Sequence, residues 1–302
     1  MDTALEERKT QNLHGQMLVK NGLKQEVFYN EVMNLDKEKQ NGMMAKDSSR
    51  RDFIKLMSVA GVAVTGLSTA CSNIKSIVQK PEKENLCFLF QGDSITDGNR
   101  GRNEDPNHIL GHGYCFAVSS RIGADFPQYG FQFINRGISG NSVRDLEKRW
   151  QTETLDLKPD VLSLLVGIND VNAIIEGKEE ATDAKTFDAT YRKLLTLCKE
   201  QNPDMLIVLG LPFFFASGWR KDQYEKWHPI IHERAEIVRQ IAADFNAVVI
   251  DYPQVFEKAQ RTPIDYWIWD GVHPTAFGHE LMACEWIKQV SKRLNFLKLY
   301  TD

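Results

Sequence analysis

The stretch LCFLFQGDSITDG, residues 86–98, contains the two features that decide the fold. Six mostly apolar residues, Leu86 to Gln91, predict a short buried strand. The strand stops at Gly92-Asp93-Ser94, which is how a buried strand brings a polar side chain to the edge of a sheet. Ser94 is therefore a candidate nucleophile. Gly-Asp-Ser is also an ordinary turn sequence, so this stretch alone leaves both interpretations open.

Four more short apolar runs follow the first. Each is continuous rather than alternating, which is typical of strands covered on both faces, and helical patterns separate them. The sequence therefore predicts an α/β fold with a parallel sheet between two helical layers, in one domain over residues 86–302. The expected strands are residues 86–91, 131–135, 161–166, 206–211 and 247–251. The expected helices lie near residues 114–125, 142–150, 184–201 and 221–245, with a last one beginning near 275.

The composition is that of an ordinary globular protein. Of the 302 residues, 42% are hydrophobic and 26% are charged, which is enough for a sizeable core. A nucleic-acid-binding protein usually carries an excess of basic residues, whereas the formal net charge here is −4. Nucleic acid is therefore excluded as a partner. The five cysteines lie far apart and form no CxxC, so they indicate neither a zinc site nor a disulfide framework.

The chain before residue 86 differs in character. Residues 1–48 are polar and are expected to be disordered. Residues 49–71 contain SRRDFIK followed by an uncharged run, a pattern that resembles a twin-arginine export signal. The uncharged run is short for a membrane span, although a short core helix or a single anchor is the alternative. Residues 72–85 are polar, contain Pro81, and are expected to form a linker.

Cys71 follows Ser68-Thr69-Ala70, which resembles a lipobox whose leucine is displaced by one position. Two outcomes stay open: a lipid anchor at Cys71, or cleavage after Ala70 by an ordinary signal peptidase. Either outcome predicts an exported protein, periplasmic or held at the membrane as a lipoprotein, that uses the twin-arginine export machinery. Translation from Met43 or Met44 would remove the long extension, and the mass of the precursor tests that hypothesis.

Polar residues follow the first three expected strands: Ser94, Gly140 and Asn169. Ligands of a parallel sheet bind outside the carboxyl ends of its strands, so these residues are expected to converge on one edge. Acyl transfer needs hydrogen-bond donors where an oxyanion forms, and the candidates are the N–H groups of Ser94 and Gly140 and the side-chain amide of Asn169. In isolation, glycine and asparagine at such positions are common loop residues.

Asp270 and His273 stand three residues apart in the sequence WDGVHP. On a tight loop, the carboxylate can accept the Nδ1 proton and leave Nε2 directed outward, which is how a general base is held. A serine hydroxyl needs such a base to become a nucleophile, so Ser94, Asp270 and His273 fit a catalytic triad. The alternative for Asp270 is a cap for the helix after Pro274.

Four blocks, GDSIT at 92–96, GISG at 137–140, GIND at 167–170 and DGVH at 270–273, resemble the motifs of the GDSL or SGNH hydrolase family in their order. The resemblance covers most of residues 86–294. It implies a flavodoxin-like three-layer α/β/α sandwich with a mostly parallel five-stranded sheet, hydrolysis of esters or thioesters, and no cofactor. The rival α/β-hydrolase fold expects G-x-S-x-G, but Thr96 stands at the last glycine position. The resemblance assigns the nucleophile to Ser94, the oxyanion donors to Gly140 and Asn169, and the acid and base to Asp270 and His273.

A long polar loop, residues 98–113, follows the candidate nucleophile, and such loops often carry substrate contacts. Arg100, Arg102 and His108 are candidates there, and Trp269 is a candidate beside Asp270. A solvated excursion for the loop and core packing for the aromatic residue are the alternatives. Two histidine pairs have four-residue spacing, but no HExxH is present, so no metal is expected.

Together these features predict an exported serine esterase acting on a small-molecule or polysaccharide ester. A short acyl group, acetyl, on a carbohydrate is favoured because the residues near the site are polar and aromatic and no long apolar groove is evident. A lipase, lysophospholipase or thioesterase of the same family is the alternative. A glycan-binding protein that does not hydrolyse is the alternative from another class.

Overall fold

The computed structural model describes residues 80–300, and every structural statement below concerns that part of the chain. The expected extension 1–48, the signal segment 49–71 with Cys71, and residues 72–79 of the expected linker lie outside it. Residues 80–85 form neither helix nor strand. The Asn85 N–H donates to the Tyr129 carbonyl, 2.7 Å away, which attaches the end of this segment to the domain.

The sheet has five parallel strands in the order β2-β1-β3-β4-β5. The predicted parallel α/β sandwich is therefore confirmed, and each expected strand is present to within one residue at either end. The strands are β1 (Cys87–Gly92), β2 (Gln132–Asn135), β3 (Val161–Leu165), β4 (Leu206–Gly210) and β5 (Val248–Ile250).

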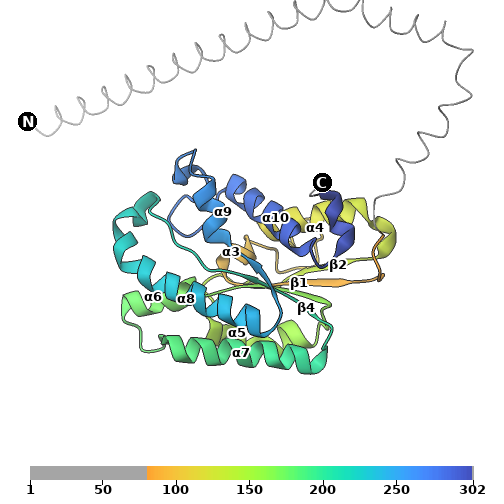
Figure 1. The fold of residues 1–302 in the computed structure, drawn as a ribbon, viewed down its shortest axis with the longest axis horizontal. Helices are drawn as coiled ribbons and strands as arrows, with labels where there is room; N and C mark the ends of the chain where they lie inside the picture. Colours follow the sequence, from red (N-terminus) through yellow and green to blue (C-terminus); the bar gives the residue numbers. More distant parts are fainter. Residues whose placement is uncertain (1–79, 301–302) are drawn as a thin grey trace, which may run out of the picture. The chain divides into compact units, whose positions relative to one another are not determined.

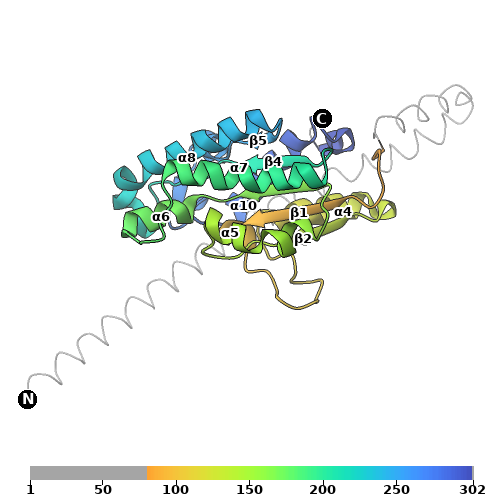
Figure 2. The same ribbon diagram turned by 90° about the horizontal axis from the view of Figure 1, so that it is seen from below.

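Helices cover both faces of this sheet (Figures 1 and 2). The helices are α3 (Ser94–Asp97), α4 (Tyr114–Asp125), α5 (Val143–Trp150), α6 (Ile168–Glu176), α7 (Ala184–Gln201), α8 (Tyr224–Asp244), α9 (Tyr252–Lys258) and α10 (Ala276–Val290). Helices α4 and α10 belong to the core on one face, and α5 and α7 belong to the core on the other. No helix within residues 80–300 is long and apolar enough to cross a membrane.

Strand β1 is buried from end to end because its side chains alternate between the two cores. Phe90 packs against Tyr114 of α4 and Trp286 of α10, with ring centroids 5.9 and 5.7 Å apart. Leu89 points into the opposite core. The indole N–H of Trp286 donates to the Ser163 hydroxyl of β3, 3.0 Å away, so this buried polar pair is satisfied. The carboxyl end of β1 is thus fixed from both sides.

The helices of residues 114–125 and 184–201 have the expected bounds. The helix expected over 221–245 differs at its start, because residues Gly218–Gln223 form a 3-10 helix, η3, before α8 begins at Tyr224. Helices α3, α6 and α9 were not expected. Helix α6 starts inside the GIND block, whose Gly and Asn resemble a turn when read alone.

Candidate active site

Ser94 lies where β1 ends and the short helix α3 begins. Gly92 has a φ of +154°, and a Cβ at this position would lie 2.2 Å from the Leu165 carbonyl oxygen, so the tight junction requires glycine. The Asp93 carboxylate caps α3 by accepting from the Ile95 N–H at 3.0 Å. The junction turns the chain directly after the buried strand and leaves Ser94 half-buried at the carboxyl edge of the sheet.

The three residues predicted as a triad form one hydrogen-bonded chain. Ser94 Oγ lies 2.8 Å from His273 Nε2, and His273 Nδ1 lies 2.8 Å from Asp270 Oδ2. The loop that carries Asp270 and His273 is closed by an antiparallel bridge between Ile268 and Pro274. Asp270 Oδ1 also accepts from the backbone N–H groups of Val272 and His273, at 3.0 and 2.7 Å. The three-residue spacing of Asp270 and His273 therefore brings the carboxylate to Nδ1 of the ring, as expected.

The electrostatics of Asp270 favour the charged carboxylate. Burial by itself would raise its pKa, but the hydrogen bonds from the His273 ring and from the backbone of His273 and Val272 outweigh burial and lower the pKa to about 2. A carboxylate here accepts the Nδ1 proton, so the lone pair of Nε2 faces Ser94 Oγ. The arrangement can therefore take the proton from the Ser94 hydroxyl.

Gly140 and Asn169, the other expected oxyanion donors, lie together in the wall of one polar pocket of about 180 Å³. Gly140 is exposed with a φ of +85° and has no atom within 4 Å of its Cβ position. The Asn169 amide donates one hydrogen bond to the Asn141 carbonyl at 3.1 Å, and an amide nitrogen carries a second proton. The rest of the wall consists of Ser142, Asp145, Asn172, Ala173, Lys178, Glu180 and Thr182.

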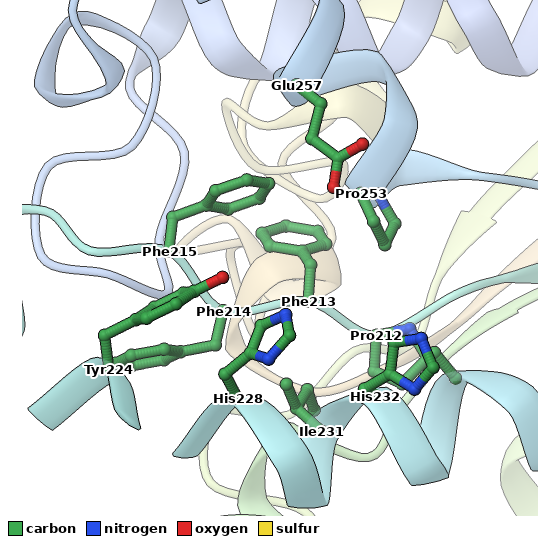
Figure 3. A pocket seen from close by; sticks show the side chains of 11 residues that line it. Pro212, Phe213, Phe214, Phe215, Tyr224, His228, Ile231, His232, Pro253 and Glu257 are labelled. Atoms are coloured by element: carbon green, nitrogen blue, oxygen red, sulfur yellow. The ribbon is translucent and has the colours of Figure 1, made fainter. Parts of the chain in front are cut away.

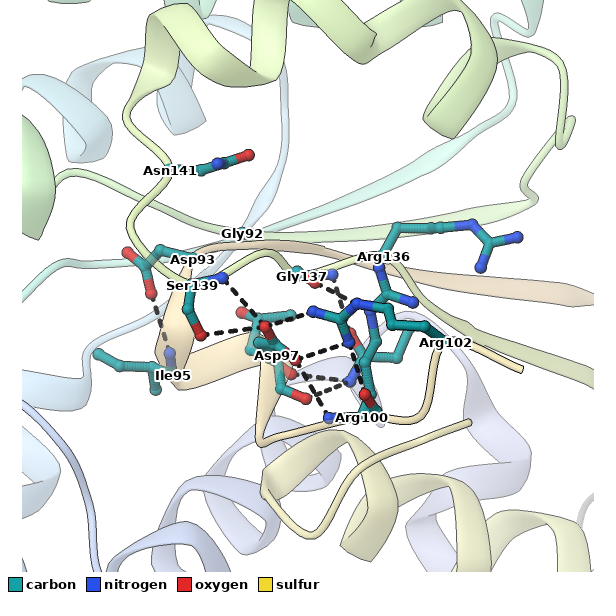
Figure 4. A network of polar contacts seen from close by, with 12 residues as sticks. Gly92, Asp93, Ile95, Asp97, Arg100, Arg102, Arg136, Gly137, Ser139 and Asn141 are labelled. Carbon is teal, nitrogen blue, oxygen red and sulfur yellow. Dashed lines mark hydrogen bonds and ion pairs between the residues drawn. The ribbon is translucent and has the colours of Figure 1, made fainter. Parts of the chain in front are cut away.

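Asp97, at the end of α3, accepts hydrogen bonds from the loop that carries Gly140 and so holds this loop in place (Figure 4). Its buried carboxylate accepts from both the backbone N–H and the hydroxyl of Ser139, each at 3.0 Å. Arg102 donates to both of its oxygens, at 3.1 and 2.7 Å. Burial would raise the Asp97 pKa, but the hydrogen bonds from Arg102 and Ser139 outweigh burial and lower it. Sequence reasoning missed Asp97 and Ser139, although both stand inside or beside the quoted motifs.

Arg100, Arg102 and His108, named as candidate substrate contacts, lie on the loop after α3. Arg100 is buried, and its Nε donates to the Gly137 carbonyl at 2.9 Å. Arg102 pairs with Asp97 as described above. The exposed His108 lies 3.5 Å from Asp105 of the same loop. These contacts favour a role for both arginines in fixing the loops, and they give His108 no contact with the triad.

Trp269, the fourth candidate substrate contact, lies at the triad. Its ring is stacked near the His273 ring, with centroids 6.3 Å apart and an interplanar angle of 26°. The side chain is 54% exposed, although it immediately precedes the buried Asp270. Of the four candidates, Trp269 is therefore best placed to meet a substrate.

The buried Asp93 and the half-buried His279 also interact electrostatically with His273. Burial raises the pKa of Asp93 to about 7, and the Oδ2 atom of Asp93 has no hydrogen-bond partner. Burial, together with the nearby His112 and His273, lowers the pKa of His279 to about 4. The neutral His279 ring accepts from the Tyr114 N–H at 3.1 Å through Nδ1. His279 is therefore neutral at physiological pH.

A second, more apolar pocket lies between the segment after β4, residues 212–215, and helices α8 and α9 (Figure 3). One wall is formed by Phe213, Phe214 and Phe215, and the Phe215 N–H donates to the Gly271 carbonyl at 2.9 Å. This wall thereby supports the loop that carries Asp270 and His273. His228 and His232 lie on one face of α8 at the pocket, but within residues 80–300 no three His, Cys, Asp or Glu side chains are grouped to hold a metal ion.

A three-layer α/β/α sandwich with a Ser–His–Asp chain at the carboxyl edge of its sheet defines a class of hydrolases that act on acyl groups. The model of the GDSL-like Lipase/Acylhydrolase family matches residues 90–281, and the chain belongs to this family. The protein is therefore a carboxylic ester hydrolase.

Three relatives illustrate the match. The acetylxylan esterase of Geobacillus stearothermophilus is 32% identical over 209 residues, which cover 67% of this chain and 93% of that enzyme. Its crystal structure superposes with a TM-score of 0.62, covering 70% of this chain and 96% of the other. A putative GDSL-like lipase from Parabacteroides merdae is 34% identical, with a TM-score of 0.65 and coverages of 69% and 97%. An uncharacterized lipoprotein of Bacillus subtilis is 23% identical over 133 residues, covering 39% of this chain and 53% of the relative.

Proposed function

We propose that the protein is an exported serine esterase that removes acetyl groups from a carbohydrate. The observation that carries the proposal is the chain of two 2.8 Å contacts that links Ser94, His273 and Asp270. Such a chain supplies the base that a serine hydroxyl needs. Crystal structures of the acetylxylan esterase include a Ser-to-Ala and an Asp-to-Ala variant, both described as catalytic mutants, which supports the same chemistry here.

In the proposed reaction, Ser94 Oγ attacks the ester carbonyl carbon while its proton moves to His273 Nε2. Asp270 holds the ring and stabilises the imidazolium that forms. The N–H groups of Ser94 and Gly140 and the Asn169 amide donate to the oxyanion. The intermediate collapses, the departing sugar oxygen takes the proton from Nε2, and an acyl-enzyme remains on Ser94. Water then attacks that ester with His273 as base, which releases acetate and restores Ser94.

The proposed substrate class follows from the pocket beside Gly140 and Asn169. Polar and charged side chains dominate its wall, among them Asn172, Lys178 and Glu180. Such groups can hydrogen-bond sugar hydroxyls but would have to be desolvated by a long acyl chain. The relative that is an acetylxylan esterase supports an acetylated polysaccharide as substrate.

The alternatives are a lipase, lysophospholipase or thioesterase of the same family, and a glycan-binding protein without activity. Acetate release from acetylated polysaccharides, compared with hydrolysis of p-nitrophenyl esters of increasing chain length, separates them. We expect acetyl esters to be preferred. A preference for long acyl chains would overturn the acetyl proposal, and no hydrolysis of any ester would favour the binding protein.

Two pocket variants test where the sugar binds. Asn172→Ala and Lys178→Ala should raise KM for an acetylated oligosaccharide and leave hydrolysis of p-nitrophenyl acetate unchanged. Lys288→Ala is the matched control, because Lys178 and Lys288 are both exposed and paired with a glutamate nearby in sequence, Glu176 and Glu285. Unchanged KM in both pocket variants would place the sugar elsewhere.

For localisation, we propose export by the twin-arginine machinery, with lipid attachment at Cys71. The sequence SRRDFIK and the relative that is a lipoprotein support this proposal. Replacing Arg50 and Arg51 by lysine should retain the precursor in the cytoplasm. Cys71→Ala should release the protein from the membrane while export continues. Export that tolerates the lysine replacements would contradict the proposed route.

A further inference from the structure

Asp270 Oδ2 has a second partner besides His273. Arg220, from the 3-10 helix η3, places Nη1 2.9 Å from this oxygen, the same atom that lies 2.8 Å from His273 Nδ1. The same Nη1 also reaches the Asp270 backbone carbonyl, at 3.5 Å. The side chains of Arg220 and Asp270 are 18% and 3% exposed, so the ion pair is largely shielded from water.

The guanidinium of Arg220 is held in place by aromatic rings. Its Cζ lies 4.1 Å from the centroid of the Trp219 ring and 5.9 Å from that of Trp227. Trp227 is buried and stacks on Phe214 at 4.8 Å. A planar guanidinium stacked on tryptophan is pre-organised to donate in its own plane. The packing of η3 and α8 therefore fixes the donor that reaches Asp270.

We propose that Arg220 is a positioning residue of the catalytic centre: it orients the Asp270 carboxylate and, by its charge, favours the neutral ring of His273 that can accept a proton. This inference rests on the proposed function. The physical reason is that Arg220 and His273 both donate to the same oxygen, Asp270 Oδ2. A permanent cation beside Asp270 offsets part of the negative charge that would otherwise stabilise the imidazolium of His273. Removing that cation favours the protonated ring, which cannot accept the Ser94 proton.

The other groups that face His273 do not replace this charge. They are Asp270 on its own loop, Asp93 and Ser94 at the start of α3, and His279 of α10. His279 is neutral above its pKa of about 4. Asp93 also titrates nearby, with a pKa of about 7. Its carboxyl group is present in the wild type and in every Arg220 variant. Comparison between variants therefore isolates the effect of Arg220.

The test compares Arg220→Met, which removes the charge and keeps the length, with Arg220→Lys, which keeps the charge. Two quantities are measured: the pH profile of kcat/KM for p-nitrophenyl acetate, and the titration of the His273 ring by nitrogen-15 NMR. For Arg220→Met we expect kcat to fall about tenfold with little change in KM, and both the acid limb and the titration to move up by about one pH unit. Arg220→Lys should leave both near their wild-type positions.

Arg239→Met is the control, because Arg239 also pairs with an aspartate, Asp251, at 3.0 Å, away from the triad. Lower kcat in Arg220→Met with an unmoved acid limb and an unmoved titration would overturn the inference, since it would show a structural role alone. If the wild type hydrolyses no ester but the titration still moves, the proposed function fails and the electrostatic role of Arg220 stands.

Discussion

Ser139 donates two hydrogen bonds to one oxygen of Asp97, from its backbone N–H and from its hydroxyl, each 3.0 Å long. Ser139 directly precedes Gly140, and Asp97 lies one helical turn after Ser94. The pair therefore fixes a candidate oxyanion donor relative to the candidate nucleophile, although the two come from different strand ends. We therefore expect the geometry of the proposed oxyanion site to depend on this link.

Asp97→Ala should lower kcat for p-nitrophenyl acetate by about tenfold to a hundredfold, because the loop of Gly140 loses its anchor. It should also lower the free energy of unfolding by about 1–3 kcal/mol, since buried donors lose their acceptor. Steady-state kinetics and urea unfolding measure the two effects. Asp188→Ala is the control, as Asp188 pairs with Arg192 on the surface of α7. Full activity in Asp97→Ala would contradict the anchoring role.

Gly140→Ala separates backbone strain from catalysis. Gly140 and Gly177 have φ values of +85° and +67°, and neither has an atom within 4 Å of its Cβ position. Alanine at either site should therefore cost about 1 kcal/mol of stability. Only Gly140→Ala should also lower kcat/KM, because the added methyl group would lie beside the proposed oxyanion site. Equal kinetics for the two variants would remove Gly140 from the oxyanion site.

Asp93→Asn tests how the buried Asp93 carboxyl group changes the free energy of unfolding with pH. The folded-state pKa of about 7 lies above the unfolded value, so the wild type loses stability as pH rises from about 4 to 7. Asparagine does not titrate. The stability of the variant relative to wild type should therefore rise between pH 5 and pH 8, by on the order of 2 kcal/mol. Urea unfolding at the two pH values measures this, and a constant difference would contradict the raised pKa.

His279→Asn should produce the opposite pH dependence. The folded-state pKa of about 4 lies below the unfolded value, so the contribution of the neutral ring is full above about pH 6.5 and is lost as pH falls toward 4. Asparagine keeps an acceptor for the Tyr114 N–H but carries no titrating ring. Between pH 7 and pH 5 the variant should lose about 2 kcal/mol less than the wild type. An identical loss in both proteins would show that His279 is protonated in the fold.

The sequence was sufficient to predict the parallel sheet and the hydrogen-bonded loop of Asp270 and His273, because both depend on local pattern. Continuous apolar runs mark buried strands, and the spacing of Asp270 and His273 suits a hydrogen-bonded loop. The contact of Arg220 with Asp270 was not predictable, because it joins η3 to a loop fifty residues later and depends on the placing of Arg220 near the Trp219 and Trp227 rings. Arg100 illustrates the same difficulty: its place on the loop after Ser94 suggested a substrate contact, whereas its guanidinium donates to the Gly137 carbonyl.

Helix α6 was missed for a related reason. Its first turn coincides with the GIND block, and glycine and asparagine are both common in turns and loops, so the block alone does not indicate a helix. In the fold, Asp170 is buried and accepts from the Thr182 hydroxyl at 2.7 Å and from the Val143 N–H. These partners lie 12 and 27 residues away in sequence. No local sequence pattern predicts these two hydrogen bonds.

The central claim, that Ser94 is the nucleophile activated by His273, is tested most directly by covalent labelling with a fluorophosphonate followed by mass spectrometry. The reagent forms a bond between Ser94 Oγ and phosphorus with loss of fluoride. We predict one adduct on the peptide that contains Ser94 in the wild type, none in Ser94→Ala, and strongly slowed labelling in His273→Ala. An unlabelled wild type, or ester hydrolysis that persists unchanged in Ser94→Ala, would contradict the account.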